Sequence, residues 1–212
     1  MQRLIEGIRK FRAEGFGPYE GLFQKLAREG QRPHSLFITC SDSRVLAELI
    51  THSRPGDLFV VKNVGNIVPP ASVAGSTNST AAAIEYAVEV LGVEDVVVCG
   101  HSQCGAMRAL MQGTGDLPRM EHLENWLSLA EPVRETVLHR YAHLRGSDEQ
   151  IDAAGQENVL HAVESLKTYP CVRRRMKEDG LRLHSWFFRI AGAELFAYEP
   201  SAGEFLPLIG AV

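Results

Sequence analysis

A chain of 212 residues, 45% of them hydrophobic, is long enough to bury the core of one compact domain. Its formal net charge of −4 argues against a nucleic-acid partner, because phosphate binding requires a clustered basic surplus. No apolar stretch approaches the roughly 20 residues of a membrane span, and the N-terminus lacks the apolar core of a signal peptide. We therefore expect a soluble cytoplasmic protein whose thiols stay reduced.

Residues 1–30 are predicted to form one or two amphipathic helices. Apolar side chains recur there at helical spacing, are interrupted by Gly15, Gly17 and Pro18, and then resume. This helical arm is expected to pack either on its own domain or on a neighbouring molecule. Residues 31–212 would then form the core of a single domain, since no repeat or linker divides them.

Three short apolar runs are predicted to be buried strands, at 35–40, 58–61 and 93–99. A helix is predicted over residues 80–91, with Ser79 or Thr80 as its N-cap. Strands that alternate with helices favour right-handed crossovers and a parallel sheet. The fold class is therefore predicted as α/β, with a mostly parallel central sheet flanked by helices.

The second half of the chain is predicted to begin with helices and to end in strands. Residues 119–145 and 149–167 have mostly helical character. Near the end, the segments 181–190 and 194–198 flank a short Ala-Gly-Ala turn at 191–193. This pattern predicts a C-terminal antiparallel hairpin at the edge of the sheet.

Two short polar motifs directly follow predicted strands, Cys40-Ser41-Asp42-Ser43-Arg44 and His101-Ser102-Gln103-Cys104. They fall at the carboxyl edge of the sheet, where open α/β folds bind ligands. Cys40, His101 and Cys104 offer two thiolates and one imidazole, which suits zinc and leaves a fourth tetrahedral position for a reactant. His101 and Cys104 converge on one ion if a helix begins there, with Gly100 and Gly105 allowing close backbone approach.

Cys99 offers an alternative in which a fourth protein ligand closes the site into a structural one. Its predicted strand is buried on both faces, however, and this favours Cys99 as a core residue. Cys171 lies far from both motifs and is predicted to be structural. The choice between an open and a closed site therefore depends on where the Cys99 side chain lies.

Asp42, two residues after a predicted ligand, has two functional interpretations. It takes the fourth metal position, or it accepts a hydrogen bond from the reactant there. Arg44 is placed to hold the carboxylate through a bidentate pair and to keep it ionised. The structural alternative is a plain turn, since Ser-Asp-Ser is typical of turns.

The first motif, with the later Gly-His-Ser-x-Cys-Gly, resembles the β-class carbonic anhydrases, and the likeness covers nearly the whole chain. Further matching stretches are 62–70, 82–88 and 157–159. The resemblance implies reversible hydration of carbon dioxide with one Zn²⁺ per subunit, and an Asp42–Arg44 dyad. It implies a substrate pocket that is partly supplied by the partner subunit. The pocket positions that the resemblance implies are Gln31, Phe59, Val64, Ile84, Tyr86 and Gly105.

The resemblance also implies a homodimer, often doubled into a tetramer, in which the helical arm embraces its neighbour. The opening residues 1–7 and the segment 143–146 are most similar to cyanobacterial, carboxysome-associated members. This implies a location inside a carboxysome, with carboxysome components as partners.

The sequence departs from the family pattern in three ways. One branch has a second, inhibitory bicarbonate pocket of Trp, Arg and Tyr, and the matching residues here are Phe37, Lys62 and Phe188. Because lysine lacks the planar guanidinium fork, we predict that this inhibition is lost or weakened. The segment 75–80 is poorer in glycine than in the family, and Ser185 replaces a usual glycine without an evident reason.

Three other functions remain open at this point. A sibling hydrolase acting on carbon disulfide or carbonyl sulfide would use the same donors. A non-catalytic zinc protein for assembly would have Cys99 closing the site. A thiol enzyme would use Cys40 or Cys104 with His101, without a metal.

Overall fold

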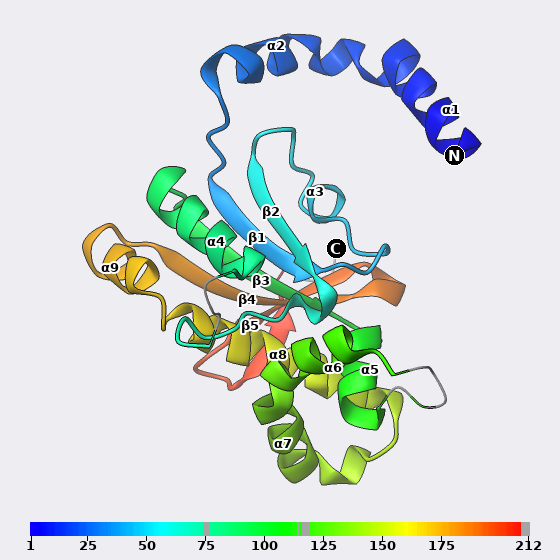
Figure 1. The fold of residues 1–212 in the computed structure, drawn as a ribbon, viewed down its shortest axis with the longest axis vertical. Helices are drawn as coiled ribbons and strands as arrows, with labels where there is room; N and C mark the ends of the chain where they lie inside the picture. Colours follow the sequence, from blue (N-terminus) through cyan, green and yellow to red (C-terminus); the bar gives the residue numbers. More distant parts are fainter. Residues whose placement is uncertain (74–76, 114, 116–118, 209–212) are drawn as a thin grey trace.

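The computed structural model describes residues 1–73, 77–113, 115 and 119–208. Its centre is a six-stranded sheet with the strand order β2-β1-β3-β4-β5-β6 (Figure 1). The strands are β1 Ser35–Cys40, β2 Leu58–Asn63, β3 Asp95–His101, β4 Arg182–Arg189, β5 Glu194–Glu199 and β6 Glu204–Pro207. The first four are parallel, and β5 and β6 are antiparallel to their neighbours. The predicted mostly parallel sheet with a C-terminal hairpin is confirmed, and β6 is an addition.

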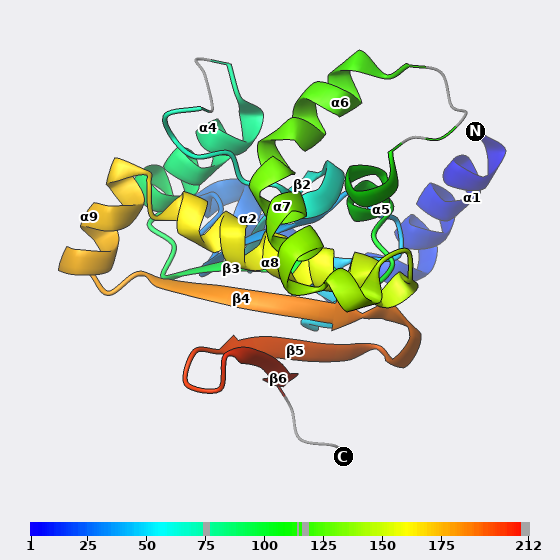
Figure 2. The ribbon, with the colours of Figure 1, turned by 90° about the horizontal axis from the view of Figure 1, so that it is seen from below.

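Helices flank both faces of this sheet. In chain order the helices are α1 Gln2–Lys10 and α2 Glu20–Glu29, which form the N-terminal arm, and then α3 Ala47–Ile50, α4 Ser79–Glu85, α5 Gly105–Gln112, α6 Glu121–Leu127, α7 Glu131–Arg140, α8 Asp148–Leu166 and α9 Pro170–Glu178. Figure 2 shows α8 lying along the sheet, with α6 and α7 on its far side. On this face, Leu36 and Val98 pack against α4 and α8, whereas Phe37 and Val97 pack against α3 on the other. Burial on both faces explains why the strands are continuous apolar runs.

The predicted helix at 80–91 is present, but its start is set differently. Asn78 is the N-cap, and its Oδ1 accepts a hydrogen bond of 3.1 Å from Ala81 N. The prediction of Ser79 or Thr80 as the cap was wrong, because both already lie in the first turn. The helix continues as a π-helical segment, Tyr86–Val90. Of the segment 75–80, residues 75 and 76 lie outside the described residues.

The N-terminal arm extends away from the sheet (Figure 1). Apolar side chains on α1 are open to solvent, with Leu4 68% and Ile8 64% exposed. Three phenylalanines of the arm contact one another, at 11, 16 and 23, with ring centroids 5.9–6.5 Å apart. Of the two expectations for the arm, packing on its own domain is met only by α2, whose Leu26 lies against Gly56, whereas the apolar side chains of α1 stay uncovered.

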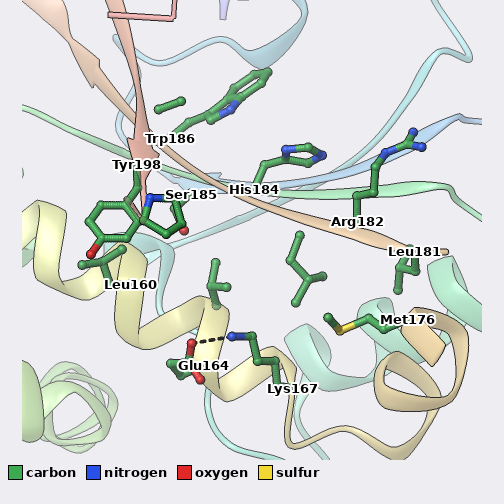
Figure 3. Close-up of a pocket in the computed structure, with 14 residues that line it drawn as sticks. Leu160, Glu164, Lys167, Met176, Leu181, Arg182, His184, Ser185, Trp186 and Tyr198 are labelled. Atoms are coloured by element: carbon green, nitrogen blue, oxygen red, sulfur yellow. Dashed lines mark hydrogen bonds and ion pairs between the residues drawn. The ribbon is translucent and has the colours of Figure 1, made fainter. Parts of the chain in front are cut away.

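A cavity of about 710 Å³ lies between α8, α9 and the strands β4 and β5 (Figure 3). Glu164 and Lys167 form an ion pair of 2.6 Å at its side. Ser185, which departs from the family pattern, lines this cavity and not the polar edge of the sheet. Within the described part of the chain, no helix combines the length and apolar character needed to cross a membrane.

Candidate metal centre

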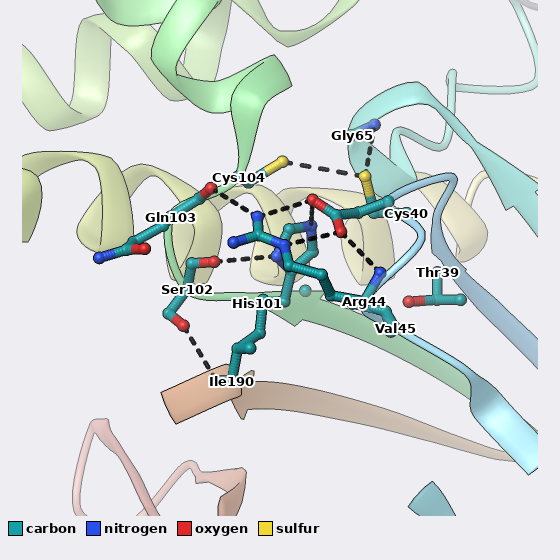
Figure 4. A network of polar contacts seen from close by, with 12 residues as sticks. Thr39, Cys40, Arg44, Val45, Gly65, His101, Ser102, Gln103, Cys104 and Ile190 are labelled. Atoms are coloured by element: carbon teal, nitrogen blue, oxygen red, sulfur yellow. Dashed lines mark hydrogen bonds and ion pairs between the residues drawn. The ribbon is translucent and has the colours of Figure 1, made fainter. Parts of the chain in front are cut away.

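Cys40, His101 and Cys104 meet at the carboxyl edge of the sheet (Figure 4). Cys40 ends β1, and His101 ends the neighbouring strand β3. All three side chains are buried, and their donor atoms lie within 4.8 Å of one another. The two Sγ atoms are 3.9 Å apart. A tetrahedral zinc with Zn–S bonds of about 2.3 Å separates two sulfurs by about 3.8 Å, so the spacing fits this ion.

A turn, not a helix, brings His101 and Cys104 together. The helix α5 begins only at Gly105, and Cys104 is its N-cap residue with extended backbone. Between them, Gln103 has a positive φ of 52°. The predicted helical spacing of the two ligands was therefore wrong, although their convergence was right.

The two predicted glycines next to the ligands differ in role. A Cβ at Gly100 would lie 2.7 Å from Val159 Cγ2 on α8, so only glycine fits the close approach of strand and helix. A Cβ at Gly105 would meet nothing within 4 Å. Glycine is therefore needed at position 100 because the strand and α8 approach each other closely there. No such contact within this chain requires glycine at position 105.

The imidazole of His101 is oriented to bind a metal through Nε2. Its Nδ1 lies 2.9 Å from Ser102 O, which fixes Nδ1–H as the donor and leaves the lone pair on Nε2. His101 is fully buried, and its Nε2 has no hydrogen-bond partner. A buried nitrogen without a partner is costly, and a metal ion satisfies it.

The thiol of Cys40 is surrounded by groups that favour its ionised form. Its pKa is lowered, chiefly by the hydrogen bond from Cys104 and then by His101 and backbone N–H groups, against the effect of burial. One of these is Gly65 N, 3.4 Å from Sγ. The same contact and burial raise the pKa of Cys104. The paired thiols and the surrounding N–H groups therefore favour one thiolate in this pair.

Asp42 and Arg44 form a bidentate pair beside the donors. Arg44 Nε donates to Oδ1 at 2.9 Å and Nη2 to Oδ2 at 2.8 Å, and Arg44 N also donates to Oδ1. The hydrogen bond from Arg44 holds the pKa of Asp42 well below its usual range. Oδ2 lies 3.9 Å from His101 Nε2. The segment is thus more than a plain turn, since it presents an ionised carboxylate to the metal donors.

The remaining cysteines lie in the core. Cys99 is fully buried among Phe37, Val97 and Phe188, on the α3 face of the sheet, and burial raises its pKa to about 12. It does not belong to the donor group. Cys171 packs in the core cluster between the sheet and α8. The prediction that both are packing residues agrees with these positions, and Cys99 does not close the site.

The six predicted pocket positions are not brought together within this chain. Val64 and Gly105 are sequence neighbours of Gly65 and Cys104, at the metal centre. Ile84 is fully buried in the core, and Tyr86 contacts Phe59 with ring centroids 5.8 Å apart.

The two outermost pocket positions lie at the opposite end of the strands. Phe59 pairs with Leu36, four positions before Cys40 and so about 13 Å away along the strand. Gln31 precedes the start of β1. Within one chain, neither residue reaches the metal donors.

Two residues that shape the site were given no role in it by the sequence analysis. Trp126 on α6 donates from Nε1 to Val64 O at 2.7 Å, and Asn158 Nδ2 donates to Gly65 O at 2.8 Å. The sequence pattern around Trp126 predicts a helix but no partner for its indole N–H. A half-buried indole usually needs an acceptor, but its partner 62 residues away leaves no local signal.

The fold and the donor set define an α/β protein with a three-residue Cys-His-Cys zinc site at the carboxyl edge of its sheet. Residues 35–195 match the family model described as "Carbonic anhydrase". The chain belongs to the carbonic anhydrase family. β-Class carbonic anhydrases are zinc enzymes, in agreement with the donors found here.

Relatives match over nearly the full chain. The carbonic anhydrase of Synechocystis is 43% identical, over 97% of this chain and 74% of its own. That of Pseudomonas aeruginosa is 39% identical, over 98% of this chain and 92% of its own.

Two solved structures support the assignment. The β-carbonic anhydrase CcaA has a TM-score of 0.92 at 41% identity, with 100% of this chain and 93% of that chain covered. One of two tetrameric β-carbonic anhydrases of Sordaria macrospora has a TM-score of 0.79 at 30% identity, with 99% and 96% covered.

Proposed function

We propose that this chain catalyses the reversible hydration of carbon dioxide to bicarbonate and a proton, with one Zn²⁺ held by Cys40, His101 and Cys104. The observation that carries this proposal is the buried, unpartnered Nε2 of His101, which faces two sulfurs 3.9 Å apart in a carbonic anhydrase chain. Zinc on these donors supplies a Lewis acid that makes water nucleophilic near neutral pH.

Asp42 has the role of orienting the reacting water. Both of its carboxylate oxygens accept hydrogen bonds from Arg44, and its lowered pKa keeps it ionised and able to accept only. Lys62 Nζ donates to the carbonyls of Asp42 and Val45, at 3.1 and 2.7 Å, and so holds the turn that carries the carboxylate. Arg44 thus fixes the direction of Asp42 without contacting the reactant itself.

The test combines metal analysis with a stopped-flow assay in which a pH indicator follows proton release. Cys40→Ala should lose both zinc and activity, whereas Cys171→Ala, a matched removal of a core thiol, should retain both. Asp42→Asn should keep zinc and lose about 100-fold in turnover, within the usual range for a positioned proton-accepting group. Wild-type protein without stoichiometric zinc, or an Asp42→Asn variant with full turnover, would overturn the proposal.

The pH profile provides an independent test of the donor set. Two thiolates cancel the formal charge of zinc, so water bound there should be less acidic than at a three-histidine site. Activity should therefore rise from neutral to mildly alkaline pH. A rate that is flat or falls over this range contradicts the proposed donors.

The sibling reaction on carbon disulfide or carbonyl sulfide would use the same donors. Assaying these substrates beside carbon dioxide with one enzyme preparation separates the two activities. A thiol enzyme is separated by its response to a chelator, because its activity would survive removal of the metal and would be lost on alkylation.

A second copy of the chain completes the proposed pocket. Gln31 and Phe59 lie at the far end of β1 and β2 from Cys40, so they serve a site only if it belongs to a partner. The exposed apolar side chains of α1 offer the surface that a partner would cover, and the Sordaria macrospora relative is tetrameric. We therefore place Gln31, Phe59, Val64, Tyr86 and Gly105 in a pocket formed by a homodimer or a higher oligomer, whereas Ile84, fully buried in the core, would support this pocket from within its own chain.

Mixed dimers test this shared pocket. Gln31→Ala and Cys40→Ala chains should each have low activity alone. When they are refolded together, half of the sites in each heterodimer combine an intact Cys40 with an intact partner Gln31, and activity should return. Mixtures that show only the sum of the two separate activities contradict a shared pocket.

We also propose that the protein works in the cytoplasm, packaged in a carboxysome with its components as partners. The support is the similarity to cyanobacterial carbonic anhydrases over 92–97% of the chain. Fractionation of the native cells should place the protein with carboxysome shells. Recovery in the free cytosolic fraction alone would refute the packaging.

A further inference from the structure

The turn that joins two of the metal donors has an unfavourable backbone conformation. Gln103, between His101 and Cys104, has a φ of 52°, in the left-handed region that glycine tolerates and glutamine rarely adopts. Such a residue persists only where surrounding contacts fix it. The contacts of this turn therefore decide where His101 and Cys104 point.

The first half of the turn is fixed by the end of β4. Ser102 N donates to Phe188 O at 3.0 Å, and Ser102 Oγ accepts from Ile190 N at 3.0 Å. These bonds hold Ser102, whose carbonyl in turn accepts from His101 Nδ1.

The second half is fixed by a carboxylate on α8. Gln103 N donates to Asp152 Oδ1 at 2.7 Å, a short hydrogen bond to a charged acceptor. The carbonyl of the same residue accepts from Arg44 Nη2 at 3.3 Å, as Figure 4 shows. Gln103 therefore links Asp152 on one side to the Asp42–Arg44 pair on the other.

We propose that Asp152 is a positioning residue for the metal centre. Its carboxylate holds Gln103 in the left-handed conformation, and this sets both the separation of His101 from Cys104 and the direction of the carbonyl that Arg44 contacts. The inference deepens the proposed function and rests on it. Asp152 contacts neither reactant nor donor atoms, so it acts through Gln103.

A general role in helix stability does not account for this contact. Asp148 and Glu149 already place negative charge in the first turn of α8, where it is favourable, and Ser147 caps the helix. Asp152 lies a further turn along. Asp148 is a matched control, since it lies on the same helix and its carboxylate accepts a 2.7 Å bond from Arg108.

The experiment measures how fast zinc passes from the intact holoenzyme to an excess of a coloured chelator, together with kcat and KM for carbon dioxide. Asp152→Ala should release zinc about 10-fold faster and lower kcat about 10-fold, as is usual for groups that orient metal ligands. Asp148→Ala should leave both unchanged. Cobalt-substituted Asp152→Ala should show altered visible bands, which report the coordination geometry.

Asp152→Asn keeps an acceptor oxygen but loses the charge, so its zinc-release rate should fall between those of wild type and Asp152→Ala. This variant tests the inference even if Asp152→Ala does not fold. Equal release rates for all variants, or equal effects of Asp152→Ala and Asp148→Ala, would overturn it. Zinc release and the cobalt spectrum do not depend on turnover. They therefore test the positioning role of Asp152 even if the wild-type protein proves inactive on carbon dioxide.

Discussion

Replacement of Gly65 by alanine tests how the metal centre is built. Gly65 has a φ of 80°, its N–H points at Cys40 Sγ, and its carbonyl accepts from Asn158. A Cβ added there would lie 2.9 Å from Ala106 Cβ and 3.1 Å from Met107 Cε. Gly65→Ala therefore introduces both backbone strain and a clash with α5, the helix that follows Cys104.

The cost of this substitution can be assembled from its parts. A non-glycine residue in the left-handed region costs about 1–2 kcal/mol. Overpacking against a rigid neighbour costs about 1–3 kcal/mol. Alanine has less conformational freedom than glycine in the unfolded chain, and this stabilises the fold by about 0.4–1 kcal/mol. The free energy of unfolding should therefore fall by about 3 kcal/mol.

Gly146→Ala is the matched control, because Gly146 has a φ of 82° and a Cβ there would meet nothing within 4 Å. It carries the strain without the clash, so it should cost about 1 kcal/mol. Urea denaturation of metal-depleted chains, at one protein concentration, gives both values. If Gly65→Ala costs no more than Gly146→Ala, the contact with α5 does not constrain the site, and the reasoning fails.

Three further outcomes are expected. Hydrogen bonds from Arg182, and then from His184, lower the pKa of Asp95 in the folded chain. The ionised carboxylate therefore stabilises the fold at any pH above the unfolded pKa of about 3.9. This contribution is lost as the pH falls through the lower folded pKa. Asp95→Asn should thus destabilise the protein at neutral pH, and urea midpoints of variant and wild type should converge in acid. Asn78→Ala should remove the cap of α4 and cost about 1 kcal/mol in the same assay, whereas an equal cost from Ser79→Ala would contradict the observed cap. Bicarbonate should inhibit the initial rate weakly and without cooperativity, because Phe37 and Phe188 are buried in an apolar cluster and the Lys62 ammonium already binds two carbonyls; strong cooperative inhibition in a titration would refute this.

The sheet could be predicted because its strands carry a strong local signal. Residues 35–40 are all buried, and they are apolar enough to be recognised as a strand without their partners. The edge strand β6, Glu204–Pro207, carries no such signal, since only Phe205 is partly buried and the strand ends in proline. It forms because β5 offers an unpaired edge, which is a tertiary property.

The donors could be predicted for a related reason. Cys40 and His101 each end a strand, and the parallel arrangement alone brings such ends to one edge. The path from His101 to Cys104 could not be predicted, because it depends on a left-handed Gln103 that Asp152, 49 residues away, holds in place. The local sequence also could not identify the N-cap of α4, because Asn78, Ser79 and Thr80 are all of residue types that cap helices well.

Three departures from ordinary folding rules lie close to the metal donors. Gln103 and Asn66 are non-glycine residues with positive φ, and His101 keeps a buried nitrogen without a partner. Cys99, two residues before His101, lies in a well-packed apolar cluster and shows none of these features. A sequence selected for folding alone would not retain a strained turn and an unsatisfied imidazole side by side. Zinc binding offsets the free-energy cost of the strained turn and the unpartnered nitrogen, because an ion that binds only the folded chain stabilises that chain by mass action.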